Sequence, residues 1–581
     1  MRSLLKYLGA YKKECVLAPL FKMLEAIFEL FVPFVVADII DRGIGGRDSG
    51  AVISGAVLMI VLGIVGLLSA VTAQYFAAKA ATGFSTALRH DLFAHIMSLS
   101  HKEIDGLSSS TMITRMTSDV NQAQTGVNMF LRLFLRSPFI VFGAMIMAFT
   151  IDVPSAMLFV LLIAVLFAVV AFIMRLNIPM LKAVQQKLDR LTLLTRENLT
   201  GSRVIRAFCL EGSEEKGFRE DNQAYIGAQL RSGRISALLN PLTYVIVNLA
   251  IIILIDTGAV RVQAGALTPG KVVALYNYMS QILVELVKFA NLILTINKAL
   301  ASGNRIADVF KVQSSLTDQG TDLSLTTCRE DALDKKESPA VSFEGVSFRY
   351  HENGDYALSD LSFSAAPGET VGIIGGTGSG KSTIVNLIPR FYDASEGTVR
   401  VFGQDVKDIS LSSLRGEIGL VPQKAVLFQG TIADNLRWGN ENAGDAELME
   451  AVRLAAAEEV VEQKGGLTGP VSQGGTNFSG GQKQRLTIAR ALVRKPRILI
   501  FDDSSSALDY LTDLKLRQNL RKLDYAPTVF MISQRTATIK NADQILVMDD
   551  GELAGAGTHE ELMRTCPVYR EIHESQGEHE G

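Results

Sequence analysis

The chain has 581 residues, too many for a single hydrophobic core, and 48 % of them are hydrophobic whereas only 20 % are charged. This composition is apolar for a soluble protein, so part of the chain is expected to lie in lipid. The formal net charge of −3 gives no reason to expect nucleic acid as a partner.

The N-terminal residues and the cysteines indicate the compartment. Residues 1–13 are basic and amphipathic, which predicts an interfacial helix before a first membrane span and no cleavable signal. Cys15, Cys209, Cys328 and Cys566 lie far apart and lack metal-ligand spacing. They predict free thiols in a reducing compartment rather than a disulfide framework or a zinc site.

The N-terminal half contains about six apolar runs that could cross a bilayer. They cover residues 16–40, 52–78, 138–151, 156–173, 238–260 and 272–296, and the third could be extended by helical residues from position 127. The two long connections, residues 79–136 and 175–234, are polar and basic, with Arg132 and Arg136 near a span end. The positive-inside rule therefore places the N-terminus, both long connections and the C-terminal half in the cytoplasm. Both connections have helical periodicity and are expected to continue the spanning helices, each turning at a short contact segment.

Ionisable or amide residues fall inside two of these runs. Lys22, Glu25 and Glu29 share a helical face of the first, and Gln281, Glu285 and Lys288 share one of the sixth. They could form a polar cavity wall for amphiphilic or cationic cargo. They could equally pair with one another, as Glu285 with Lys288, or snorkel to the interface, as Lys22.

The alternation of strand and helix patterns after the membrane half predicts an α/β nucleotide-binding domain. We therefore divide the chain into a transmembrane domain at 1–313, a polar linker at 314–339, the α/β domain at 340–576 and a tail at 577–581.

A phosphate-binding loop stands near the start of this domain. The segment GGTGSGKST at residues 375–383 places Gly375 and Gly380 at the template glycines, between a short apolar strand and a helix. Glycines let backbone N–H groups surround phosphates, Lys381 can neutralise phosphate charge, and Ser382 can hold Mg²⁺. The spacing predicts a nucleoside triphosphate site.

Other parts of a phosphoryl-transfer site follow. An apolar strand ends in Asp502 and Asp503, of which one can hold Mg²⁺ through water and the next can face an attacking water. Gln423 is a neutral amide that could contact Mg²⁺ or water. Segment 478–482, FSGGQ, precedes a helix and offers a second anion-binding helix start. One chain has a single triphosphate site but two phosphate-binding motifs, the loop 375–383 and the segment 478–482. The second motif has a use if another such domain docks face to face with this one and presents its own triphosphate.

The domain resembles the ATPase domain of ABC transporters, and nearly the whole chain resembles a bacterial ABC exporter half-transporter of the multidrug or lipid type. The resemblance implies ATP and Mg²⁺ as cofactors, with Ser382, Gln423 and Asp502 at the metal and coupling helices near 106–113 and 208–215. It also implies a multi-pass protein of the bacterial plasma (inner) membrane. The family motifs fall on Tyr350 (adenine stacking), Gly375, Gly378, Gly380, Lys381, Ser382 and Thr383 (Walker A), Gln423 (Q-loop), Ser479, Gly480, Gly481 and Gln482 (signature), Asp502 (Walker B) and Asp509 (D-loop).

Two residues depart from the family pattern. Asp503 stands where the family usually has glutamate, and Gln534 stands where it usually has a switch histidine. An aspartate oxygen sits about 1.5 Å further back than a glutamate oxygen, and a misplacement of about 1 Å can cost on the order of 10²-fold in rate. Glutamine can donate a hydrogen bond but cannot titrate.

With Gln423, Asp503 and Gln534 are the catalytic candidates. Their identities resemble the degenerate-site subunit of a heterodimeric exporter, whose own site binds ATP but hydrolyses it poorly and whose signature completes the partner's site. An active homodimeric exporter and an ATP-gated channel or sensing protein are the alternatives. The substrate is expected to be amphiphilic or hydrophobic.

Overall fold

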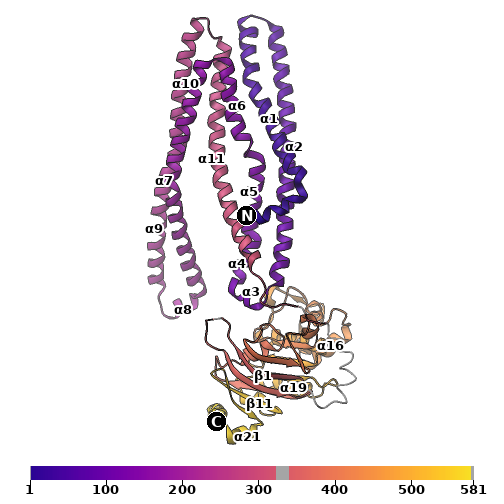
Figure 1. Cartoon of the computed structure of the whole chain (residues 1–581). Helices are drawn as coiled ribbons and strands as arrows, with labels where there is room; N and C mark the ends of the chain where they lie inside the picture. Colours follow the sequence, from indigo (N-terminus) through magenta and orange to yellow (C-terminus); the bar gives the residue numbers. More distant parts are fainter. Residues whose placement is uncertain (1, 319, 322–338, 352, 578–581) are drawn as a thin grey trace. The chain divides into compact units, whose positions relative to one another are not determined.

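The computed structural model describes residues 2–318, 320–321, 339–351 and 353–577. They form two compact units, one made of Met1–Met97 with Ser109–Val312 and the other of Ser98–Ser108 with Gln313–Gly581 (Figure 1). Most of the predicted linker and nearly all of the predicted tail lie outside the described residues, as does Cys328. The predicted domain boundaries therefore stay predictions.

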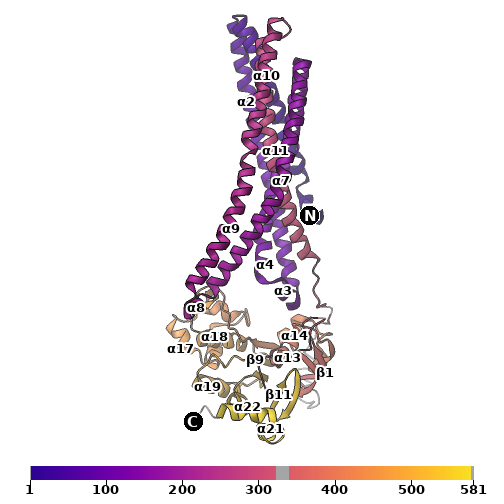
Figure 2. The same cartoon turned by 90° about the vertical axis from the view of Figure 1, so that its left-hand side faces the viewer.

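The first unit is helical throughout. Its elements are η1 (Arg2–Tyr11), α1 (Lys12–Asp38), η2 (Ile39–Gly45), α2 (Ser49–Ser98), α4 (Ser109–Thr114), η3 (Arg115–Asp119), α5 (Val120–Leu133), α6 (Arg136–Ile151), α7 (Val153–Thr200), α8 (Ser202–Ala207), α9 (Glu211–Ala237), α10 (Leu239–Gln263) and α11 (Pro269–Lys311). The long polar connections continue the apolar helices, as predicted, so that α2 has 50 residues and α7 has 48. Figures 1 and 2 show α7 and α9 side by side.

Five helical segments of this unit are long and apolar enough to cross a membrane. They are Ser49–Ser98, Ser109–Ile151, Val153–Thr200, Glu211–Gln263 and Pro269–Val309. They cover the second to sixth apolar runs of the sequence, whereas the first run falls on α1, a helix of 27 residues that is not among the five. The helices pack through small buried residues such as Ala26, Ala144 and Ala274, which let helix backbones approach closely in lipid.

Polar contacts join helices that are far apart in the sequence. The buried Tyr278 of α11 donates its hydroxyl hydrogen to the Leu30 carbonyl of α1 at 2.6 Å. Asp152 caps α7 by accepting from the Ser155 N–H at 3.1 Å, and it also accepts from Arg261 at 2.7 Å. These contacts fix the turn between α6 and α7 against the end of α10.

The second unit begins with α3 (His101–Leu107) and contains two main sheets. A four-stranded antiparallel sheet has the order β2-β1-β4-β5, and a six-stranded sheet has the order β12-β11-β3-β10-β9-β6, parallel except for β12. The strands are β1 (Val341–Phe348), β2 (Leu358–Ala365), β3 (Thr370–Gly375), β4 (Glu396–Val401), β5 (Gln404–Asp405), β6 (Ile418–Val421), β7 (Gly430–Thr431), β8 (Pro470–Val471), β9 (Ile498–Asp502), β10 (Thr528–Ile532), β11 (Gln544–Asp549) and β12 (Glu552–Gly557).

Helices cover the six-stranded sheet (Figure 2). They are α13 (Lys381–Leu387), α14 (Leu411–Gly416), α15 (Ile432–Arg437), α16 (Asp445–Leu454), α17 (Glu458–Gln463), η4 (Gln473–Gly475), α18 (Gly480–Val493), α19 (Tyr510–Leu520), α20 (Thr536–Ile539), α21 (His559–Thr565) and α22 (Pro567–Gly577). Strands β3, β9 and β10 are continuous apolar runs because both faces of this sheet are buried. Their carboxyl ends meet at one sheet edge, where the candidate site lies.

Candidate active site

The phosphate loop joins β3 to α13 and needs glycine at particular positions. Gly378 and Gly380 have φ values of 87° and 92°, which favour glycine. A Cβ on Gly380 would lie 2.6 Å from the Ala357 carbonyl oxygen, and one on Gly375 would lie 2.1 Å from the Met548 carbonyl oxygen. The loop is therefore closed to side chains at these positions, and its backbone N–H groups remain accessible to a phosphate.

Lys381 is held inside this loop. Its side chain is buried, and its Nζ donates to the carbonyls of Gly375 at 3.0 Å and Gly376 at 2.5 Å. Burial lowers the pKa of Lys381, while the carboxylates of Asp503 and Asp502 act in the opposite direction. The Lys381 ammonium group is held by neutral carbonyl oxygens and has two carboxylates close by. It can therefore exchange the carbonyls for a phosphate oxygen while staying in the same place in the site.

Two of the magnesium candidates come from helix α13 and strand β9. The Ser382 hydroxyl donates to Asp502 Oδ1 at 2.9 Å, which brings the first turn of α13 against the end of β9. Burial raises the pKa of the Asp502 carboxyl, opposed by the Ser382 hydrogen bond. One hydroxyl and one carboxylate suit Mg²⁺, because this ion usually keeps several waters and takes its other ligands from substrate phosphates. Ser382 and Asp502 are therefore compatible with the predicted Mg²⁺ site, which stays a prediction, whereas the predicted third ligand Gln423 is directed at Asp503.

Asp503 and Gln423 also lie together. Asp503 is 9 % exposed with a φ of 45°, and its Oδ2 is 3.4 Å from Nε2 of Gln423, which follows β6. A left-handed backbone is rare for a non-glycine residue and marks a constrained position. The Asp503 carboxylate thus follows Asp502, the candidate Mg²⁺ ligand, directly in the chain and has a neutral amide as its partner.

Gln534 follows β10, the strand between β3 and β9, so it lies at the same sheet edge. Its side chain is exposed, and its backbone carbonyl accepts from Gln576 Nε2 at 2.6 Å. Across the described residues, no hydrogen bond joins its amide to Asp503 or to the phosphate loop.

Tyr350 stands beside the phosphate loop. Its hydroxyl lies 3.0 Å from the Thr383 hydroxyl, and its ring makes edge contacts with Phe348 and Tyr392 at centroid distances of 4.8 Å and 5.3 Å. The ring is thereby fixed near the loop. That it stacks on adenine stays a prediction.

The signature segment forms the start of α18. Ser479 caps this helix by accepting from the Gln482 N–H at 3.3 Å, and its own N–H donates to Gln482 Oε1 at 3.0 Å. Gly480 is exposed, and a Cβ on Gly481 would lie 2.9 Å from the Ala507 carbonyl oxygen. Asp509 similarly caps α19 through Thr512, and these hydrogen bonds lower its pKa.

The signature does not complete this chain's own phosphate site. Within the described parts of the chain, no hydrogen bond or ion pair joins residues 478–482 to the phosphate loop. Their exposed helix start is available to another molecule.

Helix α3 supplies site neighbours that sequence patterns did not single out. The His101 ring stacks on Phe391 at 4.3 Å, and the Tyr392 hydroxyl donates to Asp105 at 2.8 Å. Because Tyr392 also touches Tyr350, a chain of contacts leads from α3 to the phosphate loop. The contact segment expected near 106–113 thus lies earlier, at Ser98–Ser108, and residues 109–113 belong to α4 of the first unit.

The ionisable residues that the sequence placed in the first and sixth apolar runs are paired. Arg136 donates to Glu285 at 2.6 Å and to Glu29 at 2.7 Å, Lys288 to Glu285 at 2.8 Å, and Lys22 to Glu25 at 2.5 Å. Three cations thus face three carboxylates. The predicted pairing of Glu285 with Lys288 is present, and the sequence had placed the central Arg136 only at a span end.

Two family models match the chain. The model described as ABC transporter transmembrane region matches residues 15–286. The model described as ABC transporter matches residues 358–506, within the second unit.

Curated relatives and solved structures match along most of the length. An uncharacterized ABC transporter ATP-binding protein of Bacillus subtilis, YfiB, is 36 % identical over 100 % of this chain and 99 % of its own. An ATP-dependent lipid A-core flippase of Syntrophus aciditrophicus is 29 % identical over 84 % of this chain and 80 % of its own. The structure of a bacterial Atm1-family ABC exporter with ATP bound superposes with a TM-score of 0.79 at 25 % identity, covering 98 % of this chain and 99 % of that one.

Proposed function

The chain belongs to the ABC transporter family as an ATP-hydrolysing exporter with a helical membrane region and an ABC ATPase domain, and we propose that it exports amphiphilic or hydrophobic compounds as one subunit of a heterodimer. One observation supports the heterodimer proposal. The phosphate loop and the Ser382–Asp502 pair are well formed, but aspartate and glutamine stand at the two catalytic candidate positions Asp503 and Gln534. In this proposal the membrane is the bacterial plasma membrane, and the ATPase domain faces the cytoplasm.

Binding of ATP uses groups whose geometry is complete. Lys381 and the loop N–H groups would hold the phosphates, and Ser382 and Asp502 would hold Mg²⁺, which neutralises phosphate charge when bound. Tyr350 would support adenine. None of these contacts depends on Asp503 or Gln534, so the affinity for ATP is expected to be normal.

Positioning of the attacking water is the weak step. The Asp503 carboxylate has a short side chain on a constrained backbone, with Gln423 already 3.4 Å away. It therefore cannot readily advance toward a water that a longer glutamate would reach. The exposed Gln534 adds no charge. Loss of a transition-state contact lowers turnover without lowering affinity.

The signature then acts on a partner. Ser479 and the first N–H groups of α18 form an exposed, capped helix start, which suits a phosphate of another chain's ATP. We propose a partner half-transporter with glutamate and histidine at the matching positions. ATP held at this chain's site would keep the two ATPase domains in contact while the partner's site turns over.

The amphiphilic substrate class is supported by two observations. The paired intramembrane cluster has no net charge to offer a cationic cargo. One relative, matched over 84 % of this chain and 80 % of its own length, is named an ATP-dependent lipid A-core flippase.

Transport is tested in vesicles containing this chain and its partner, with a fluorescent amphiphile and ATP. We expect ATP-dependent accumulation that stops when the partner's catalytic glutamate is replaced by glutamine. ATP turnover without movement of any amphiphile, together with an ATP-gated ion current, would instead indicate a channel.

A further inference from the structure

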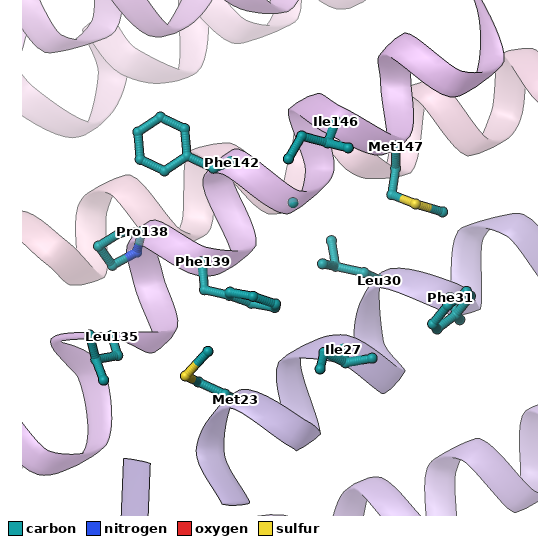
Figure 3. A pocket seen from close by; sticks show the side chains of 11 residues that line it. Met23, Ile27, Leu30, Phe31, Leu135, Pro138, Phe139, Phe142, Ile146 and Met147 are labelled. Carbon is teal, nitrogen blue, oxygen red and sulfur yellow. The ribbon is translucent and has the colours of Figure 1, made fainter. Parts of the chain in front are cut away.

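An apolar cavity of about 470 Å³ lies between α1 and α6 of the membrane unit. Met23, Ile27 and Leu30 of α1 face Phe139 and Met147 of α6 across it, as Figure 3 shows. Its volume falls in the range of about 300–1,000 Å³ that ligand pockets occupy. The cavity is therefore large enough for part of a ligand, and its lining is apolar.

One wall of the cavity continues to an arginine. Arg132, Leu135, Phe139, Phe142 and Ile146 recur at helical spacing, and the backbone stays helical between α5 and α6 at Phe134 and Leu135. They therefore share one helix face. Arg132 stands at the end of this face, one turn before the first lining residue.

Arg132 differs from the other arginine beside the cavity, Arg136. Arg136 is paired with Glu29 and Glu285. The Nε of both arginines is buried without a hydrogen-bond partner, but only Arg136 has ion pairs, and Arg132 has none with any residue that the structure describes. A guanidinium group without an acceptor is costly in apolar surroundings, so an anionic acceptor at the terminal nitrogens of Arg132 would stabilise it.

The depth of Arg132 matches that of a lipid phosphate. Asp152 marks the turn between α6 and α7, and Arg132 precedes it by twenty residues, about 30 Å along a helix. The hydrocarbon core of a bilayer is also about 30 Å thick. Arg132 thus lies at the headgroup level on the side opposite the turn, and the apolar cavity lies at acyl-chain depth.

We propose that this groove binds a phospholipid, with one acyl chain between α1 and α6 and the phosphate on Arg132. The half-exposed side chains of Phe31, Leu135 and Ile146 leave the groove accessible from outside the unit. The site concerns binding alone, so it holds whether or not the transported compound is a lipid.

The test uses the full chain with its partner in lipid nanodiscs that contain a trace of phosphatidylethanolamine with a diazirine midway along one acyl chain. After illumination, labelled peptides are mapped by mass spectrometry. We expect labelling concentrated on residues 23–31 and 135–147, and little labelling by diacylglycerol with the same diazirine, because it lacks the phosphate.

Two substitutions with matched controls separate the phosphate contact from the acyl groove. Arg132→Gln should reduce labelling about tenfold, the effect of losing one charge-assisted hydrogen bond. Arg175→Gln, an exposed arginine at a similar depth on α7, should not. Leu135→Trp should fill the groove and reduce labelling, whereas Leu68→Trp on the exposed face of α2 should leave it unchanged.

Labelling spread evenly over all membrane helices would overturn the proposal, as would equal labelling in Arg132→Gln and Arg175→Gln. Absence of lipid adducts on residues 23–31 and 135–147 of the unmodified protein, with adducts on other membrane helices, would also overturn it.

Discussion

At the residue scale, we propose that the site separates groups that hold ATP from groups that position the water. Lys381 is hydrogen-bonded to the phosphate loop, and Ser382 is hydrogen-bonded to Asp502. The Asp503 carboxylate accepts from the neutral Gln423 at 3.4 Å, and the Gln534 side chain is exposed. Binding and hydrolysis should therefore respond to different substitutions.

The first prediction follows from that separation. Asp503→Glu combined with Gln534→His should raise single-turnover hydrolysis at this site by on the order of 10²-fold, because the carboxylate regains its reach. The affinity for ATP should change little. The measurement is single-turnover hydrolysis and nucleotide occupancy in the heterodimer, with the partner's catalytic glutamate removed to silence its site.

Hydrolysis that stays at background in the double variant would show that these two residues do not limit the site. An empty nucleotide site in the unmodified protein would contradict the role of this site as a clamp. Lys381→Ala serves as the control that lowers occupancy.

At the element scale, two helix ends have roles beyond the fold. The start of α18 is capped by Ser479, and α3 stacks on the ATPase unit through His101. Each can be changed with a matched control elsewhere in the chain.

Ser479→Ala should stop turnover at the partner's site. It removes the hydroxyl and a cap worth about 1 kcal/mol. Thr558→Ala is the control, because Thr558 caps α21 with the same capping box and lies outside the nucleotide motifs. Steady-state ATP turnover of the heterodimer, together with the melting temperature, separates the two effects. Equal losses of turnover in both variants would mean that Ser479 is only a cap.

The contact of α3 should weaken in acid. Burial and the nearby Arg415 lower the pKa of His101 below its usual 6.5, against a smaller opposite effect of Asp105. The unfolded segment then binds more protons than the folded one, so stability is present above pH 6.5 and is lost as the pH falls below it. Tyr392 holds Asp105 on the same surface.

Hydrogen exchange of residues 98–108, corrected for intrinsic rates, should show protection that declines between about pH 7 and about pH 5. His101→Phe keeps a ring against Phe391 and should remove this decline. A pH dependence that persists unchanged in His101→Phe would assign it to another group.

Features set by neighbouring residues in the sequence could be predicted, whereas contacts between residues far apart in the sequence could not. The apolar strands beside the phosphate loop and Asp502 were predicted from local patterns, and the structure has them as β3 and β9. The pairing of Arg136 was not predicted, because its partners Glu29 and Glu285 are 107 and 149 residues away and no local spacing specifies them. The position of α3 on the ATPase unit was misjudged by several residues for the same reason, since Phe391 and Tyr392 decide it.

At the scale of the whole molecule, one chain carries one membrane region, one phosphate loop and one signature. The superposition on an Atm1-family exporter covers nearly the whole chain, and the relative YfiB has almost the same length. Among the described residues, the signature segment has no hydrogen bond or ion pair with the phosphate loop of its own chain, and we propose that it acts on a second chain. In this proposal, the departures at Asp503 and Gln534 are the reason to expect that the second chain differs from the first.

The central claim is tested most directly by steady-state ATP turnover of the purified chain alone and of the chain copurified with a half-transporter that has glutamate and histidine at the matching positions. The account predicts turnover near background for the chain alone, and robust turnover for the pair that is lost when the partner's glutamate is replaced by glutamine. Turnover by the chain alone at the rate of the pair would contradict it and would show an active homodimer.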